Sequence, residues 1–133
     1  MSYRAYSFHI PCALVITDDM LSMLCEKIGK NPDDDNIWDI ADALEEHGLC
    51  IQVNGDVEGD VIPFDKHNNN SSYYVDSGII SYIECSYYPS LFKAVYKDYK
   101  ALINDFREIV AGWLPDDFPI EQNLWEIIGV TYG

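Results

Sequence analysis

The sequence of residues 3–29 is YRAYSFHIPCALVITDDMLSMLCEKIG, and it changes from a strand pattern to a helix pattern within one stretch. Its first part, residues 3–16, is rich in aromatic and branched side chains that favour a strand, and Pro11 places this strand at a sheet edge or breaks it. From Thr17 onward the apolar residues recur at helical spacing, on a helix that Thr17 caps and Gly29 ends. A strand that leads directly into an amphipathic helix indicates a mixed fold.

The rest of the chain extends this mixed pattern. The elements expected after residue 29 are a helix at 37–48, strands at 49–53, 56–64 and 73–88, a helix at 90–113 and a strand at 124–132. Asn54-Gly55 is a strong signal for a hairpin between the first two of these strands. The order is β-α-α-β-β-β-α-β, with one strand uncertain. It predicts an α+β fold in which helices pack on one face of a mostly antiparallel sheet, within a single domain spanning 1–133.

The composition combines a large negative charge with enough apolar residues for a core. The chain has 23 acidic residues against 8 Lys and Arg, a formal net charge of −15, 48% hydrophobic residues and 14% aromatic residues. A disordered acidic tail would have the charge without the aromatic residues. We therefore expect a folded domain with its charge on the surface, which repels nucleic acid and acidic membranes and attracts basic proteins.

The acidic residues are concentrated in the helix expected at 37–48, in the turn before it and in the strand at 56–64. Acidic residues two apart on a strand lie on one face, about 6.5 Å from each other, which is of the same order as the spacing of phosphates along a nucleic-acid strand. The pattern predicts an acidic ridge that imitates the phosphate backbone; the alternative is a solvated surface that keeps the protein soluble. The candidate partner-binding residues are Asp33, Asp34, Asp35, Asp39, Asp42, Glu45, Glu46, Asp56, Glu58 and Asp60.

Tyrosines gather in the second half of the chain and support contact with a partner, because tyrosine combines apolar area with a hydroxyl group. In each of the adjacent pairs Tyr73/Tyr74 and Tyr87/Tyr88, one ring is expected to point outward from a strand. The alternative is that most of them are half-buried sheet residues. The tyrosines concerned are Tyr73, Tyr74, Tyr82, Tyr87, Tyr88, Tyr96 and Tyr99.

Residues 54–65 resemble the calcium loop of EF-hand proteins in part. Asn54, Asp56 and Glu58 alternate as ligands would, and a glycine follows. The first ligand is Asn rather than Asp, Pro63 interrupts the exit, and no helix is predicted on either side in the required pose. We therefore expect a hairpin here rather than a calcium site.

Two His-x-x-Cys pairs, His9/Cys12 and His47/Cys50, could in principle supply the four ligands of a zinc ion. Residues three apart on a strand face opposite ways, so no metal is expected. The four cysteines lie within apolar segments, which indicates reduced, mostly buried thiols in a cytosolic protein. No nucleophile motif, phosphate-binding glycine loop or dinucleotide fingerprint is present, and the sequence therefore predicts neither an enzyme nor a cofactor.

The leading hypothesis is a cytoplasmic, non-enzymatic inhibitor that binds a basic nucleic-acid-handling protein through the acidic ridge. Phage or mobile-element counter-defence proteins, of the anti-CRISPR or anti-restriction type, are its natural setting. Direct binding of nucleic acid or a membrane is not expected, since the charge opposes it and no stretch of about 18 apolar residues occurs. The alternatives are an immunity protein that neutralises a nuclease toxin, a small ligand- or metal-binding domain, and an adaptor that forms a homodimer through its tyrosine-rich strands.

Overall fold

The elements of the fold are taken from a computed structural model, which describes residues 4–64, 71–84 and 99–132. The α+β class, the antiparallel sheet and the expected order of elements are confirmed. The elements are β1 (Ala5–Val15), α1 (Asp18–Ile28), α2 (Ile37–Glu46), β2 (Gln52–Pro63), β3 (Tyr73–Glu84), α4 (Tyr99–Ile109), a short 3₁₀ turn η1 (Glu121–Asn123) and β4 (Leu124–Tyr132).

The predicted boundary between β1 and α1 is confirmed. The Thr17 hydroxyl accepts a hydrogen bond from the backbone N–H of Met20 at 3.3 Å, as an N-cap should. Gly29 follows the helix with a φ of 70°, the left-handed conformation that glycine adopts without steric cost, and its N–H bonds to the Cys25 carbonyl. These two caps fix where the strand pattern gives way to the helix.

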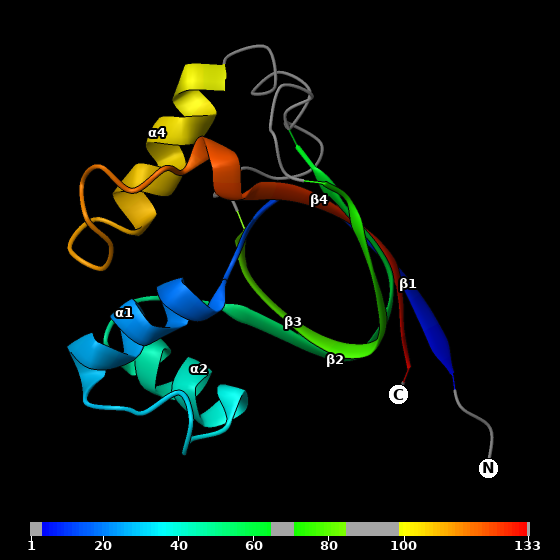
Figure 1. Cartoon of the computed structure of the whole chain (residues 1–133), viewed down its shortest axis with the longest axis horizontal. Coiled ribbons are helices and arrows are strands. Elements are labelled where there is room, and N and C mark those ends of the chain that lie inside the picture. Colours follow the sequence, from blue (N-terminus) through cyan, green and yellow to red (C-terminus); the bar gives the residue numbers. More distant parts are fainter. Residues whose placement is uncertain (1–3, 65–70, 85–98, 133) are drawn as a thin grey trace.

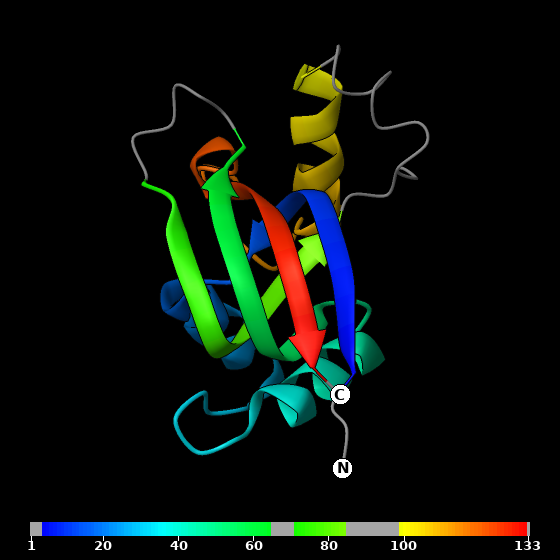
Figure 2. The ribbon, with the colours of Figure 1, turned by 90° about the vertical axis from the view of Figure 1, so that its right-hand side faces the viewer.

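The four strands form a barrel in the order β1-β3-β2-β4, and all neighbours are antiparallel. The barrel closes because β1 pairs with β4 along much of its length and also with β3 through residues 13–15. Figure 1 shows the ring of strands with α1, α2 and α4 on one side of it. The opposite side of the sheet faces the viewer in Figure 2, and no described helix covers it.

The hairpin predicted at Asn54-Gly55 is wrong, because β2 passes through it as one strand. The pairing of β2 with β3 shifts register between Asn54 and Val57, and again between Val57 and Gly59. Asp56 and Ser77 adopt positive φ values of 50° and 57° in these two irregular stretches. Bulges of this kind bend a strand sharply, so the turn-forming residues curl the sheet instead of reversing the chain.

Two groups of buried side chains stabilise the fold, and no charged or polar residue is buried among the described residues. The larger group joins the helices to the sheet, with Phe106, Leu24 and Leu44 among its fully buried members. The smaller group fills the barrel and consists of Ala13, Val15, Val57, Val61, Ile80, Tyr82, Trp125 and Ile127.

Helix α4 confirms only part of the helix predicted at 90–113. Leu102 and Phe106 of the expected apolar stripe are buried, while the start of that helix, with Leu91 and Val95, lies outside the described residues. The helix ends at Ile109, earlier than expected. Within the described ranges, no helix is both long and apolar enough to cross a membrane.

Candidate functional site

The turn before α2 holds its three aspartates through hydrogen bonds to one asparagine. The Asn31 amide donates to Asp34 at 2.8 Å, and the Asn31 backbone N–H donates to Asp35 at 2.9 Å. The backbone N–H of Asp33 donates to the Asn31 side chain at 2.9 Å. Asp33 and Asp34 are exposed and Asp35 is half-buried, so this turn presents most of its charge to solvent.

The acidic residues of α2 lie on the exposed side of the helix, as predicted. Ile40 and Leu44 are buried on the side that faces the core. Asn36 caps the helix by accepting from the Asp39 N–H at 2.9 Å, and its amide donates to the Asp39 carboxylate at 3.0 Å. The exposed acids of the helix are Asp39, Asp42, Glu45 and Glu46. We call these four residues and Asp33, Asp34 and Asp35 the helix surface.

The acidic residues of β2 also share one face, as predicted. Asp56 and Asp60 are exposed and Glu58 is half-buried, whereas Val57 and Val61 between them are fully buried in the barrel. This alternation follows from the period of two along a strand. The three carboxylates therefore point away from the barrel interior.

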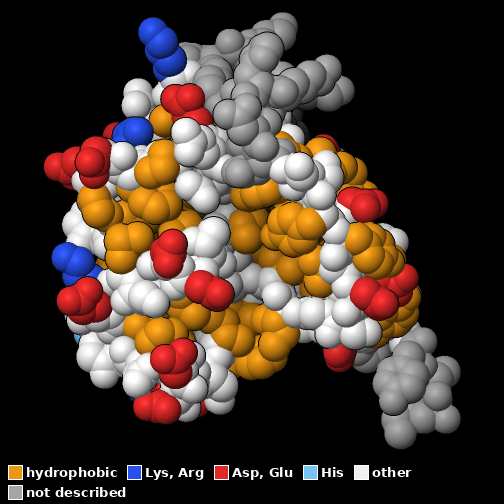
Figure 3. Space-filling view, in the orientation of Figure 1, with side chains coloured by type: hydrophobic (Ala, Val, Ile, Leu, Met, Phe, Trp, Pro, Cys, Tyr) orange, Lys and Arg blue, Asp and Glu red, His pale blue; other side chains and the backbone are white. Residues whose placement is uncertain are grey.

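The acids predicted as one ridge over residues 33–60 lie on two elements, α2 with its preceding turn and β2. Figure 2 shows α2 at one end of the barrel. Glu58 and Asp60 lie on the outward side of β2, because Val57 and Val61 on its other side are buried. The two elements meet where the Trp38 ring lies near Gly55. The space-filling view likewise shows acidic side chains in separate places, over the helices and along the barrel side (Figure 3). The candidate residues thus lie on two surfaces, and Asp56 follows Gly55 at the point where α2 and β2 meet.

Cross-strand register identifies the residues that share the outward face with Glu58 and Asp60. Asp60 is paired with Tyr74 of β3 and Ile128 of β4, and Ile128 is paired in turn with His9 of β1. Directly paired residues of antiparallel strands point to the same side. We call this surface the outer sheet face; it comprises Ala5, Ser7, His9, Glu58, Asp60, Ile62, Tyr74, Glu126, Ile128, Val130 and Tyr132.

Glu58 lies within a hydrogen-bonded cluster on the outer sheet face. The Tyr74 hydroxyl donates to one carboxylate oxygen of Glu58 at 2.7 Å, and the Tyr132 hydroxyl donates to the other at 3.1 Å. The hydrogen bond to Glu58, with smaller contributions from burial and nearby carboxylates, raises the pKa of Tyr74 to about 12. The pKa of Tyr132 is also raised, chiefly by its bond to Glu58. Both hydroxyls therefore stay protonated and hold the carboxylate at neutral pH.

Apolar area lies directly beside this cluster. Ile128 is 44% exposed and Tyr74 is 56% exposed, which is unusual for large side chains in the middle of paired strands. His9 and Glu126 lie on the same face and are joined by a 2.6 Å contact between Nε2 and Oε2. Sequence reasoning missed Glu126, Ile128 and Tyr132, although the alternation in LWEIIGVTY at 124–132 placed them on one face.

The four strands contain six acidic residues and no lysine or arginine. The acidic residues are Asp56, Glu58, Asp60, Asp76, Glu84 and Glu126.

The expected outward orientation of one residue in the pair Tyr73/Tyr74 is confirmed for Tyr74, while Tyr73 packs edge-on against the Trp125 ring with centroids 5.4 Å apart. Tyr82 is buried. Tyr87, Tyr88 and Tyr96 lie outside the described residues.

The sequence offered two candidate metal-binding motifs, the calcium-like loop at 54–65 and the two His-x-x-Cys pairs. Residues 54–63 lie within strand β2, so the alternating ligands of the calcium-like loop are spread along the strand instead of surrounding one point. Among the described residues, no group of three or more His, Cys, Asp or Glu side chains could hold a metal ion.

Of the four cysteines, Cys12 and Cys25 are buried, as expected, but Cys50 is exposed, and Cys85 lies outside the described residues. Burial, followed by the charge of Asp35, raises the pKa of the Cys25 thiol.

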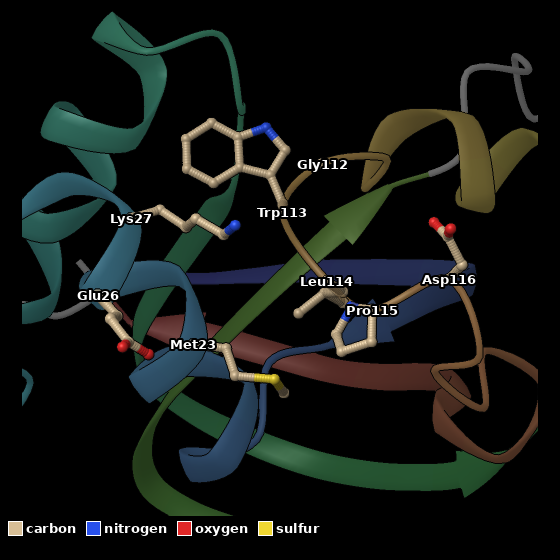
Figure 4. Close-up of a pocket in the computed structure, with 8 residues that line it drawn as sticks. All are labelled: Met23, Glu26, Lys27, Gly112, Trp113, Leu114, Pro115 and Asp116. Atoms are coloured by element: carbon tan, nitrogen blue, oxygen red, sulfur yellow. The ribbon is translucent and has the colours of Figure 1, made fainter.

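A cleft separates α1 from the segment 112–116 and has a volume of about 380 Å³. In Figure 4, Met23 and Lys27 extend from α1 toward this segment, and the Trp113 ring stands on the other side. Glu26 and Asp116 lie toward opposite ends of the cleft in this view. An aromatic wall beside one ammonium group suits a small anionic or aromatic molecule.

Comparisons with protein-family models, with curated proteins and with solved structures gave no match to this chain.

Proposed function

We propose that this chain is a non-enzymatic inhibitor that binds a basic nucleic-acid-handling protein and occupies the surface on which that protein holds phosphates. A phage or mobile-element counter-defence protein, of the anti-CRISPR or anti-restriction type, would act in this way in the cytoplasm. The observation that supports this proposal is the placement of charge, because no charged residue is buried among the described residues and the strands hold acids without lysine or arginine.

The mechanism is competitive occlusion. Carboxylates of the inhibitor pair with Arg and Lys side chains that otherwise bind the phosphates of DNA or RNA. Such pairing lies largely on exposed surfaces, so dissolved salt screens it strongly. The inhibitor therefore competes best at low ionic strength, and its association is accelerated by long-range attraction.

The test measures inhibition of a panel of basic nucleases, including RNA-guided effectors and restriction enzymes, at low and at high salt. We expect inhibition of at least one member that weakens steeply as salt is added. The informative variants replace Asp39, Asp42 and Glu46, or Glu58, Asp60 and Glu126, with lysine. A matched control replaces the exposed residues Glu108, Asp117 and Glu121 and changes the net charge by the same amount.

Loss of inhibition in one of the first two variants, with inhibition retained in the control, supports the proposal. No binding of any basic nuclease at low salt contradicts it. Equal loss in all three variants would also count against it, because the effect would then depend on total charge alone. An immunity protein that neutralises a nuclease toxin has the same surface physics, and a toxin gene beside the gene for this chain would favour that alternative.

A small-ligand-binding domain is the second candidate, and the cleft beside Trp113 and Lys27 is the observation that favours it. A ligand present at 100 times its dissociation constant stabilises a protein by about 2.7 kcal/mol. Melting curves with a set of aromatic carboxylates, with calcium and with zinc would detect such binding. A rise in melting temperature that the substitution Trp113→Ala removes would identify the cleft as the site.

A further inference from the structure

We propose that the outer sheet face, rather than the helix surface, is the contact surface of this chain, and that its partner presents arginine side chains to it. This inference rests on the proposed function and specifies which of the two acidic surfaces carries it. Three properties of the outer sheet face support this choice: a carboxylate held at both oxygens, exposed apolar area around it, and the absence of lysine and arginine from the strands that form it. Helix α2 also lacks lysine and arginine and carries the half-exposed Trp38, so the distinguishing property is that Glu58 is held by hydroxyls from two other strands.

The first property is the fixed position of Glu58. Tyr74 and Tyr132 each donate to a different oxygen of its carboxylate, at 2.7 and 3.1 Å. Each of these oxygens keeps a second lone pair that can accept from a guanidinium group. Because the carboxylate is already ordered, binding loses less side-chain entropy than it would at a freely rotating glutamate on a helix.

The second property is the apolar area around this carboxylate. Ile128 and Tyr74 flank Asp60 across neighbouring strands, and both are about half exposed. Tyrosine rings beside carboxylates match arginine, whose planar guanidinium stacks on an aromatic ring while it donates to a carboxylate. Lysine has a compact charge and makes the stacked contact poorly. The chemistry of this face therefore favours arginine.

The third property decides between a basic partner and a second copy of this chain. The four strands hold six carboxylates and no lysine or arginine. Two such faces brought together would place like charges against each other, and that arrangement costs several kcal/mol. A basic partner brings opposite charge, so charge complementarity selects it over a homodimer.

The test uses the full chain and short peptides of equal length made of arginine or of lysine. Amide chemical shifts in NMR spectra report which residues respond and how tightly each peptide binds. We expect the shifts to change on β2, β3 and β4 around Glu58, Tyr74 and Ile128, with about fivefold tighter binding of the arginine peptide. Changes confined to α2 and its preceding turn, or equal affinity for the two peptides, would overturn the inference.

A matched pair of double variants compares the two surfaces at the same net charge. Glu58→Gln with Asp60→Asn should weaken binding of the arginine peptide about tenfold, whereas Glu45→Gln with Glu46→Gln should weaken it about twofold through general electrostatics. An equal loss in both variants, or a larger loss in the helix variant, contradicts the inference.

A milder variant covers the case in which the strand variant does not fold. Tyr74→Phe keeps the ring and removes only the hydroxyl that holds Glu58, and it should weaken binding about threefold. Unchanged affinity in this variant contradicts the part assigned to the held carboxylate. If the wild-type chain binds no cationic peptide and no basic nuclease, the proposed function itself fails. If it binds them and only helix variants lose affinity, the inference alone fails.

Discussion

The helix surface and the outer sheet face are both acidic, but the fold controls their carboxylates to different degrees. On α2, Asp42, Glu45 and Glu46 extend from a helix into solvent, and the local hydrogen bonds serve the N-cap at Asn36. On the barrel, Glu58 is held by tyrosines from two other strands. A held carboxylate next to exposed apolar area is suited to specific contact, whereas freely extended carboxylates supply solubility and long-range attraction.

The largest expected loss of stability comes from disrupting the sheet that carries the outer sheet face. Gly59 and Gly129 are paired where β2 and β4 approach closely, and a Cβ added at Gly59 would lie 2.6 Å from the Gly129 Cα and closer still to the Ile128 carbonyl oxygen. Gly59→Ala must push two backbones apart, and we expect it to lower the free energy of unfolding by about 3 kcal/mol. Denaturant unfolding measures this loss.

Gly55→Ala on the same strand is the matched control. Its Cβ would lie 3.4 Å from the Trp38 ring, an ordinary contact, so its effect should stay within about 1 kcal/mol. Equal losses from the two substitutions would show that β2 and β4 are not closely packed at Gly59.

A smaller loss of stability is expected when only the N-cap of α2, which carries the helix surface, is removed. Asn36→Ala removes the acceptor for the Asp39 N–H and should cost about 1 kcal/mol in the free energy of unfolding. Asn104→Ala, at an exposed position within α4, should change it by less than about 0.5 kcal/mol. Affinity for the arginine peptide should be the same in both variants, because neither touches the outer sheet face. Weakened binding in the Asn36 variant alone would assign the contact to the helix surface.

The smallest effect on stability is expected only at high pH, and it concerns the hydrogen bond between Tyr74 and Glu58. The pKa of Tyr74 is about 12, above the ordinary value near 10 that it regains on unfolding. A raised pKa means that this hydrogen bond stabilises the native state fully below pH about 10, and that its contribution is lost as the pH rises toward 12. The difference in tyrosinate absorbance between wild type and Tyr74→Phe should show one group titrating near pH 12.

Two further variants test the cause of this shift. Glu58→Gln should lower the pKa of Tyr74 toward its ordinary value, because the strongest contribution is the bond to the carboxylate. Asp42→Asn removes the same charge from the helix surface and should leave the pKa unchanged. A Tyr74 pKa that stays near 12 in Glu58→Gln would exclude the hydrogen bond as its cause.

Local patterns in the sequence were enough to predict the α+β fold class and where most of the helices and strands begin and end. The last strand was predicted at 124–132 and is observed as Leu124–Tyr132, because alternation and flanking residues mark a strand within one short window. Thr17 and Gly29 were identified as caps for the same reason, since a cap bonds to residues three or four positions away. The outward direction of Asp56, Glu58 and Asp60 followed from the period of two along β2.

Closure of the sheet and the make-up of the outer face were decided only by the tertiary structure. Asn54-Gly55 is a turn signal in any short window, and it became a bulge because β2 pairs with β3 on both sides of it and with β4 from Val57 onward. Tyr132 reaches Glu58 across 74 positions of sequence, and Tyr74 reaches it across 16. Periodicity tells which way a side chain points from its own strand, but the neighbours it meets depend on pairing and register between distant segments. For this reason the sequence revealed an acidic protein, and the barrel determined which carboxylates are held in place beside exposed tyrosine and isoleucine.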